Sequence, residues 1–306
     1  MMSIMRVVIV GLGVQGRKRK LVAEADVVAT VDPVFPDATY RELEEVPLDS
    51  FDAVLICTPD SPKIKLISYL LSHHKHILVE KPLFSQESSQ LIEIQNLANT
   101  NKTTCYTAYN HRFEPHFIRM KELIESGKLG IIYSLRMFYG NGTARLVRNS
   151  EWRDQGSGVL TDLGSHLLDT CRFWFGDLKM DFTIHSSNCF ENSSPDHVVF
   201  GARSVPDIQL EVSLVSWRNH FYADIYAEKG SAHIKSLCKW GPSTFTLRER
   251  QLPSGRPNEN TVTLIQNDPT WVLEYKYFKE LCMNRKNNVE NDIWINKVLK
   301  NLYKNK

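Results

Sequence analysis

Several features that mark particular classes of protein are missing from this chain of 306 residues. It has no run of about 18 apolar residues, so no membrane-spanning helix is predicted. Lys and Arg number 37 and Asp and Glu number 35, which gives a formal net charge of +2. We therefore expect no uniform basic field for nucleic acid or anionic lipid. The sequence also lacks internal repeats and long low-complexity linkers.

The sequence also lacks closely spaced cysteines. The six cysteines, at positions 57, 105, 171, 189, 238 and 282, form no C-x-x-C spacing and no dense cluster. This favours reduced thiols and a cytoplasmic protein over a disulfide-stapled secreted domain. The short apolar segment 7–10 precedes the basic residues 17–20, the reverse of the order in a secretory signal. With 42% hydrophobic and 24% charged residues, the composition is that of a folded globular chain long enough for two domains.

The first 112 residues alternate between apolar strands and helical stretches. Strands are predicted at 7–10, 26–31, 51–57, 77–79 and 103–107. Such alternation predicts an α/β fold with a parallel sheet covered by helices on both faces. The continuously apolar runs 7–10 and 53–57 agree with strands that are buried on both sides. We therefore expect an N-terminal Rossmann domain, a doubly wound parallel sheet, over residues 1–112.

Residues 113–306 follow a different pattern. Helices are predicted near 115–126 and 161–175, with a strand at 131–139 between them. Repeated short alternating segments with turn signals fill 182–265 and predict an antiparallel sheet. Terminal helices are expected at 271–283 and 293–303. The pattern predicts a second α/β domain with an open, mainly antiparallel sheet.

A glycine-rich turn follows the first strand and opens the first helix. Gly11, Gly13 and Gly16 have the G-x-G-x-x-G spacing, and Val14 and Gln15 complete the turn. In this context the glycines allow a tight turn, close approach of a pyrophosphate, and packing of helix on strand. Exposed amides and the helix dipole then bind phosphate. A turn that serves only the fold is the alternative.

Asp32 ends the second predicted strand, where a carboxylate accepts hydrogen bonds from an adenosine ribose. No Arg or Lys stands beside it in the sequence, which favours NAD over NADP as cofactor. The alternative is an aspartate that only caps a turn before Pro33. The basic run 17–20 is interpreted as a solvated face of the first helix rather than a nuclear-targeting or nucleic-acid patch.

Two further groups of polar residues are candidates for chemistry. Glu80-Lys81-Pro82 follows the fourth strand, and open parallel sheets bind ligands outside the carboxyl ends of their strands. On the helix at 161–175, Asp162, His166 and Asp169 share one ridge. The alternatives are a surface lysine before a turn proline and a solvated Asp-His pair. Gly164 within this helix suggests that another group approaches the backbone closely.

A metal site is the other interpretation of these side chains. Asp162, His166 and Asp169 include metal-ligand types, but no further His or Cys stands at a neighbouring ligand spacing. The histidines at 73, 74 and 76 lie at a helix end, where they complement the dipole. No metal is therefore predicted.

Taken together, these residues resemble the glucose-fructose oxidoreductase, inositol dehydrogenase and MocA (Gfo/Idh/MocA) family. The matching segments are Gly11 to Gly16, Cys57-Thr58-Pro59, Glu80-Lys81-Pro82, Tyr109-Asn110-His111-Arg112-Phe113, Ser126 to Gly130, Trp152-Arg153, and Gly158 to Asp169. The chain departs from the family at Lys63, where His is frequent. Gly156-Ser157-Gly158 also replaces a common triple glycine.

The resemblance implies hydride transfer between a nicotinamide and a secondary alcohol or ketone of a sugar, sugar nucleotide or cyclitol. It implies that Lys81, Asp162 and His166 are catalytic and that Thr58, Pro59, Glu80 and Lys81 join the glycine turn in binding NAD. Substrate would contact Asn110, His111, Arg112, Trp152 and Arg153. The open sheet would mediate a dimer or tetramer, and one subset of the family accompanies surface-polysaccharide biosynthesis.

Chemistry assigns each catalytic residue a role. His166 is the base best matched to neutral pH, and Asp162 either orients it or holds a substrate hydroxyl. Lys81 stabilises the developing alkoxide or shares the proton. Arg153 is either a substrate contact or a structural ion-pair partner. Two other functions stay open, an NAD-dependent glycoside hydrolase of the same family and a non-catalytic dinucleotide-binding regulator.

Overall fold

Two compact units make up the computed structural model, which describes residues 5–150 and 153–304. The first unit comprises Met1–Asn110 and Thr270–Asn296, and the second comprises His111–Pro269 and Lys297–Lys306. The chain first passes from one unit to the other between Asn110 and His111, close to the expected boundary at residue 112. Segment 270–296, however, belongs to the first unit rather than to the second domain.

The first unit contains a five-stranded parallel sheet in the order β2-β1-β3-β4-β5. Its strands are β1 (Val7–Val10), β2 (Val27–Val31), β3 (Ala53–Ile56), β4 (His76–Glu80) and β5 (Cys105–Ala108). Its helices are α1 (Val14–Ala23), α2 (Lys63–Ser72), α3 (Ser88–Thr100), α7 (Thr270–Asn284) and the first part of α8 (Val289–Lys304). The predicted doubly wound sheet is confirmed.

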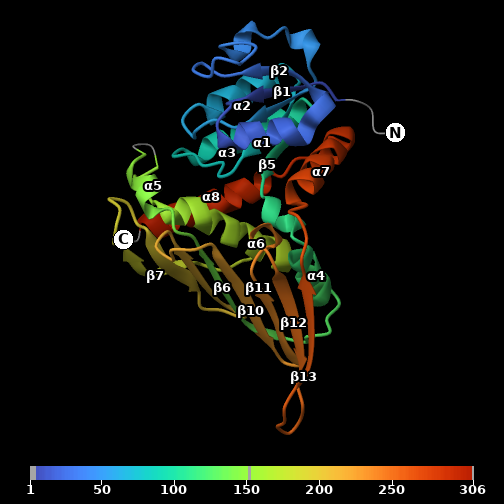
Figure 1. Ribbon diagram of the computed structural model, residues 1–306, viewed down its shortest axis with the longest axis vertical. Helices are drawn as coiled ribbons and strands as arrows, with labels where there is room; N and C mark the ends of the chain where they lie inside the picture. Colours follow the sequence, from blue (N-terminus) through green and yellow to red (C-terminus); the bar gives the residue numbers. More distant parts are fainter. Residues whose placement is uncertain (1–4, 151–152, 305–306) are drawn as a thin grey trace. The chain divides into compact units, whose positions relative to one another are not determined.

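Helices cover both faces of this sheet (Figure 1). Val8 and Val10 of β1 pack with α2 and α3, whereas Val7 and Ile9 pack with α1 and α7. Successive side chains of a strand point to opposite faces, so burial on both faces requires the continuous apolar runs seen in the sequence. Short 3-10 turns connect the elements, at η1 (Glu24–Asp26), η2 (Leu43–Glu45), η3 (Leu48–Ser50) and η4 (Asn110–Phe113).

The second unit contains an eight-stranded sheet in the order β13-β12-β11-β10-β6-β9-β8-β7. All of its described strand pairs are antiparallel except β6 with β9. The strands are β6 (Ile132–Gly140), β7 (Thr183–Asn188), β8 (His197–Ala202), β9 (Asp207–Ser213), β10 (His220–Ala227), β11 (Gly230–Lys235), β12 (Ser243–Glu249) and β13 (Asn258–Leu264). The open, mainly antiparallel sheet is thus confirmed.

Helices cover one face of the second sheet. They are α4 (Pro115–Glu125) and a π-helical turn η5 (Leu160–Gly164) that continues into α6 (Ser165–Phe175). The unit also contains α5 (Ala144–Arg148) and a 3-10 turn η6 (Cys238–Trp240). Phe221 of β10 packs on Phe117 of α4 with ring centroids 5.1 Å apart. The alternate residues of β10 are more exposed, as expected when only one face of an antiparallel sheet is covered.

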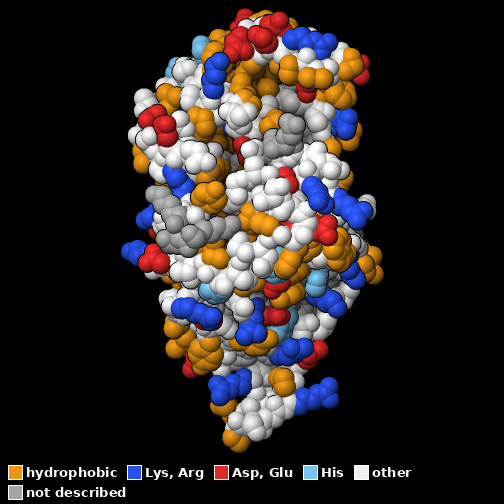
Figure 2. Space-filling view, turned by 90° about the vertical axis from the view of Figure 1, so that its left-hand side faces the viewer, with side chains coloured by type: hydrophobic (Ala, Val, Ile, Leu, Met, Phe, Trp, Pro, Cys, Tyr) orange, Lys and Arg blue, Asp and Glu red, His pale blue; other side chains and the backbone are white. Residues whose placement is uncertain are grey.

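No described helix is long and apolar enough to cross a membrane. Basic and acidic side chains are interspersed over the face of the molecule in Figure 2. This distribution agrees with the small net charge of the chain.

Arg19 corrects one expectation about the basic run on α1. Its side chain is 1% exposed rather than solvated. Its Nε donates to Glu80 Oε1 and its Nη2 donates to Glu274 Oε2, both at 2.7 Å, and its guanidinium lies 4.3 Å from the Trp271 ring centroid. Burial raises the pKa of Glu274 to about 7, although the Arg19 guanidinium opposes this effect. Arg19 therefore joins α1, the end of β4 and α7.

We predict that Arg19→Met destabilises the protein by about 3–5 kcal/mol, because it leaves two carboxylates without their buried cation. Urea unfolding followed by circular dichroism measures this change. Lys20→Met, on the exposed side of the same helix, is the matched control and should change the free energy of unfolding by less than about 0.5 kcal/mol. Equal effects of the two variants would contradict a buried ionic role for Arg19.

Candidate active site

The three glycines of the turn differ in how closely other atoms approach them. Gly11 has φ +92°, and a Cβ there would lie 2.8 Å from the Cys57 carbonyl oxygen. A Cβ on Gly16 would lie 1.8 Å from the Gly11 carbonyl oxygen, so both positions exclude side chains. A Cβ on Gly13, in contrast, would have no atom within 4 Å. The fold therefore requires Gly11 and Gly16, whereas Gly13 borders open space.

The start of α1 is open in the same way. Val14 and Gln15 are exposed, and no side chain caps this helix terminus. At the end of the neighbouring strand β3, the Thr58 hydroxyl is buried and has no hydrogen-bond partner among the described residues. Uncapped first-turn amides attract anions, so these residues fit the pyrophosphate of NAD. Pro59 follows Thr58 and is exposed.

Asp32 serves the turn itself. Its carboxylate accepts hydrogen bonds from the backbone N–H groups of Leu12, Val34 and Phe35 at 2.7–2.9 Å. Partial burial acts to raise the pKa of Asp32, but these three donors outweigh it and hold the pKa below its usual value. Asp32 thus anchors the glycine turn to β2, and the turn-capping alternative is part of its role.

The fold also brings a cation to Asp32 that the sequence did not indicate. Arg41, nine residues further on, donates from Nη1 to the backbone oxygens of Asp32 and Phe35 at 3.3 and 2.6 Å. The expectation that no basic residue stands beside Asp32 holds along the chain but not in space. Arg41 is exposed and is therefore a residue to test when NAD is compared with NADP.

Glu80 and Lys81 lie at the carboxyl end of β4, as predicted. The Glu80 carboxylate is held by Arg19, and the Lys81–Pro82 peptide bond is cis. The sequence indicates no role for Lys63, which stands where His is frequent in the family. Its ammonium bonds the backbone oxygens of Glu80 and Pro82, at 2.7 and 2.9 Å.

In the second unit, His166 is buried in a stack of rings. It is 6% exposed and lies parallel to His111, with centroids 4.1 Å apart, and Tyr139 meets it edge-on at 5.7 Å. The π-helical turn at Leu160–Gly164 immediately precedes it, and such turns occur often at functional sites. A Cβ on Gly164 would lie 3.1 Å from Leu160 Cδ1 and 3.5 Å from Phe200, which confirms the close approach expected there.

Ion pairs occupy the other predicted polar residues of this unit. The Asp169 carboxylate is 1% exposed and accepts hydrogen bonds from Arg112 Nε and Nη2 at 2.9 and 2.6 Å. Arg153 Nη2 lies 3.4 Å from Asp162 Oδ2, and both side chains are about one-third exposed. Of the solvated Asp-His pair considered as an alternative, His166 is buried, whereas Asp162 keeps about one-third of its side chain exposed. Arg112 and Arg153 thus each have a carboxylate partner within this unit.

The remaining two substrate candidates lie elsewhere. Asn110 donates from Nδ2 to Thr270 Oγ1 at 3.0 Å within the first unit. Trp152 lies outside the described residues.

Sequence reasoning missed Lys239. Its Nζ lies 3.4 Å from His111 Nε2 and 5.0 Å from the Trp240 ring centroid. Burial lowers the pKa of this ammonium, against the opposing charges of Glu114 and Asp268. No spacing in the sequence links positions 111 and 239, since 128 residues separate them. Only the fold shows that Lys239 belongs beside the histidine stack.

Glu114 is also buried, and its pKa is raised by burial even though the Cys238 N–H donates to its Oε2 at 3.1 Å. Its Oε1 has no hydrogen-bond partner among the described residues. Within the described ranges, no group of three or more His, Cys, Asp or Glu is arranged to hold a metal ion.

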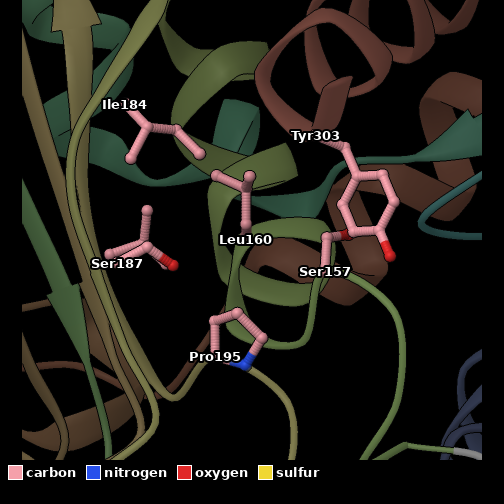
Figure 3. A pocket seen from close by; sticks show the side chains of 7 residues that line it. Ser157, Leu160, Ile184, Ser187, Pro195 and Tyr303 are labelled. Carbon is pink, nitrogen blue, oxygen red and sulfur yellow. The ribbon is translucent and has the colours of Figure 1, made fainter. Parts of the chain in front are cut away.

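A small pocket of the second unit contains none of the predicted site residues. Its walls are Ser157, Leu160, Ile184, Ser187, Pro195, Val198 and Tyr303, and the space between them is too narrow for a water molecule. Figure 3 shows that mainly apolar side chains face it. It lacks the convergent polar groups of a site that binds a hydrophilic ligand.

The fold and the glycine turn define an NAD-binding Rossmann oxidoreductase class, and comparison with family models agrees. Residues 5–109 match the model described as oxidoreductase family, NAD-binding Rossmann fold, and residues 117–233 match the GFO/IDH/MocA C-terminal domain. The chain belongs to the Gfo/Idh/MocA family.

Individual relatives support this assignment. An uncharacterised oxidoreductase of Schizosaccharomyces pombe is 33% identical over 147 residues, 46% of this chain and 39% of that protein. Inositol 2-dehydrogenase of Rhizobium meliloti is 26% identical over 47% of this chain and 43% of its own length. The matched part thus spans less than half of these curated relatives. Levoglucosan dehydrogenase in complex with NADH has the same fold, with a TM-score of 0.84, 18% identity and coverage of 98% of this chain and 96% of that one.

We predict that Gly13→Ala and Gly16→Ala separate cofactor binding from stability. A methyl group at Gly16 meets the Gly11 carbonyl and should cost about 1–3 kcal/mol of unfolding free energy. A methyl group at Gly13 meets no protein atom and should leave stability within about 0.5 kcal/mol. It should nevertheless weaken NAD binding about tenfold or more, because it fills the space for the pyrophosphate. Calorimetric titration with NAD and urea unfolding of both variants test this pair of expectations.

Proposed function

We propose that this protein is an NAD-dependent oxidoreductase that transfers a hydride between nicotinamide and a secondary alcohol or ketone of a sugar, sugar nucleotide or cyclitol. The observation that carries the proposal is the glycine turn, where close packing excludes side chains at Gly11 and Gly16 but leaves Gly13 open. Family membership supports the class of reaction, and the relatives named above act, by their names, on inositol and levoglucosan.

Bound NAD would supply the hydride acceptor. The chain's own residues then manage the hydroxyl proton and the charge on oxygen. We propose that His166 takes the proton as the carbinol carbon loses hydride, and that the Lys81 ammonium stabilises the developing alkoxide. In the reverse direction His166 returns the proton to the ketone oxygen.

The stacking of His166 on His111 supports this role, because it holds the imidazole in one orientation. Asp162, His111 and Arg153 are proposed to contact substrate hydroxyls, with Asn110, Arg112 and Trp152 as further candidates. The pairing of Arg112 with buried Asp169 suits a residue that shapes the site through the fold.

Mixing the purified protein with NAD or NADP and a panel of inositols, anhydrosugars and sugar nucleotides tests the activity. We expect absorbance at the reduced-nicotinamide band to rise with NAD, and more slowly with NADP. Arg41→Ala should slow the NADP reaction further if the guanidinium contacts the 2′-phosphate. Cofactor binding without turnover across the panel would favour the regulator, and cleavage of a glycosidic bond with recycled NAD would favour the hydrolase.

We predict that Lys81→Met and His166→Asn each lower kcat by about 10²–10⁴-fold, the usual contribution of a general base or a charge stabiliser, while NAD still binds. Lys75→Met and His116→Asn are the matched controls, and neither should show this fall in kcat. Each removes a partly or fully buried side chain of the same type that bonds a backbone oxygen, of Phe51 and Ser243 respectively. Normal turnover in either catalytic variant would refute the role assigned to that residue.

Three wider features belong to the same proposal. The exposed face of the second sheet is proposed to join copies of the chain into a dimer or tetramer, which analytical ultracentrifugation would detect. A cytoplasmic location is consistent with six cysteines that are all free. A role in surface-polysaccharide biosynthesis would make a sugar nucleotide the best substrate of the panel.

A further inference from the structure

We propose that Lys63 is a positioning residue for Lys81, and that its buried ammonium fixes the backbone on both sides of that lysine. The inference rests on the proposed function, in which Lys81 acts on the substrate oxygen. It goes beyond that function by assigning a role to a residue in which this chain departs from its family.

The geometry around the Lys63 ammonium is complete. Nζ donates to the backbone oxygen of Glu80 at 2.7 Å, to that of Pro82 at 2.9 Å, and to Asp60 Oδ1 at 2.7 Å. An ammonium has three hydrogens, so all of its donors are used. Lys63 is 3% exposed, whereas the Asp60 side chain is 46% exposed. A buried cation thus bonds the two residues that flank Lys81 and has its charge balanced from the solvent side.

This arrangement constrains a part of the chain that sheet bonding does not. β4 ends at Glu80, and Pro82 has no N–H to donate. Because the oxygens of residues 80 and 82 are both held by one nitrogen, the backbone between them has little freedom to rotate. The direction in which the Lys81 side chain leaves the backbone follows from those torsions.

A second anchor acts from the opposite face of the sheet. Arg19 of α1 holds the Glu80 carboxylate at 2.7 Å, whereas Lys63 begins α2. These helices cover opposite faces of the sheet. Arg19 fixes the side chain that precedes Lys81, and Lys63 fixes the main chain around it. The segment Glu80–Pro82 is therefore held from both faces of the sheet. Of the two cations, Arg19 bonds only the Glu80 side chain, and Lys63 bonds the backbone of the segment.

The first test needs neither cofactor nor substrate. Amide hydrogen exchange, measured by mass spectrometry, is compared for Lys63→Met, Lys63→Arg and Lys75→Met. Lys75 also donates to a backbone oxygen in this unit, but it lies before the start of β4. Lys63→Met should speed exchange in peptides spanning 80–84 by roughly tenfold, as expected when charged hydrogen bonds are lost. Lys75→Met should leave these peptides unchanged, and Lys63→Arg should restore part of the protection. Equal exchange in Lys63→Met and Lys75→Met would overturn the inference.

The second test measures turnover with the alcohol that gives the fastest NAD reduction in the panel above. Lys63→Met should lower kcat by about 10²-fold, the cost of misplacing a reacting group by about 1 Å, with KM for NAD within about twofold. When Lys81 is already replaced by Met, adding Lys63→Met should cost little more, because residues that act as a unit are not additive. A full further loss would show that Lys63 acts by another route.

The outcomes separate the two proposals. If Lys81→Met keeps its rate, the proposed role of Lys81 is wrong, while hydrogen exchange still shows whether Lys63 braces the segment. If Lys81→Met is slow and Lys63→Met turns over as fast as Lys75→Met, the inference about Lys63 is wrong and the proposed function stands. Loss of thermal stability without a change in kcat would assign Lys63 a purely structural role.

Discussion

The burial of one positive charge organises the first unit. Arg19 extends from the buried side of α1, which starts at the glycine turn, and bonds Glu80 at the end of β4 and Glu274 on α7. A desolvated guanidinium needs carboxylate partners in fixed positions, so these elements must meet at one point. Arg19 thereby links the helix that follows the glycine turn to the end of β4, next to Lys81. The same guanidinium bonds α7, whose Glu274 lies 255 residues along the chain from Arg19.

Cations held by fixed partners recur near the proposed catalytic residues. Lys63 holds the backbone around Lys81, Arg112 holds Asp169 on the helix of His166, and Lys239 lies beside His111. Arg112 and Lys239 have partners 57 and 128 residues away, whereas Lys63 bonds backbone oxygens 17 and 19 residues away. Hydride transfer needs a proton acceptor and an alkoxide stabiliser that are held before substrate arrives. These contacts are a physical means of holding them.

Much of the fold was predictable because its elements follow local rules. Continuous apolar runs predicted the parallel strands, and alternation predicted the antiparallel sheet. The exchange of residues 270–296 into the first unit was not predictable in this way, because a helix pattern does not say which sheet it covers. At the site, Gly11 and Gly16 lie in the tight turn and Lys81 follows the end of β4, as the sequence predicted. Turns and strand ends were predictable because they depend on neighbouring residues. Arg19, Arg41 and Lys239 were missed because their roles depend on partners that no spacing indicates.

The sequence by itself determined the fold class, the glycine turn and the family, since strand period, glycine spacing and short motifs are properties of neighbouring residues. Only the tertiary structure decided which charges are buried and what they bond. Arg19 looked solvated and is enclosed, the Asp162 to Asp169 ridge looked exposed and is largely packed, and Lys63 looked like a simple substitution and holds two backbone oxygens. The physical reason is that the environment of a charge depends on groups far away in the chain, which come together only when the core closes.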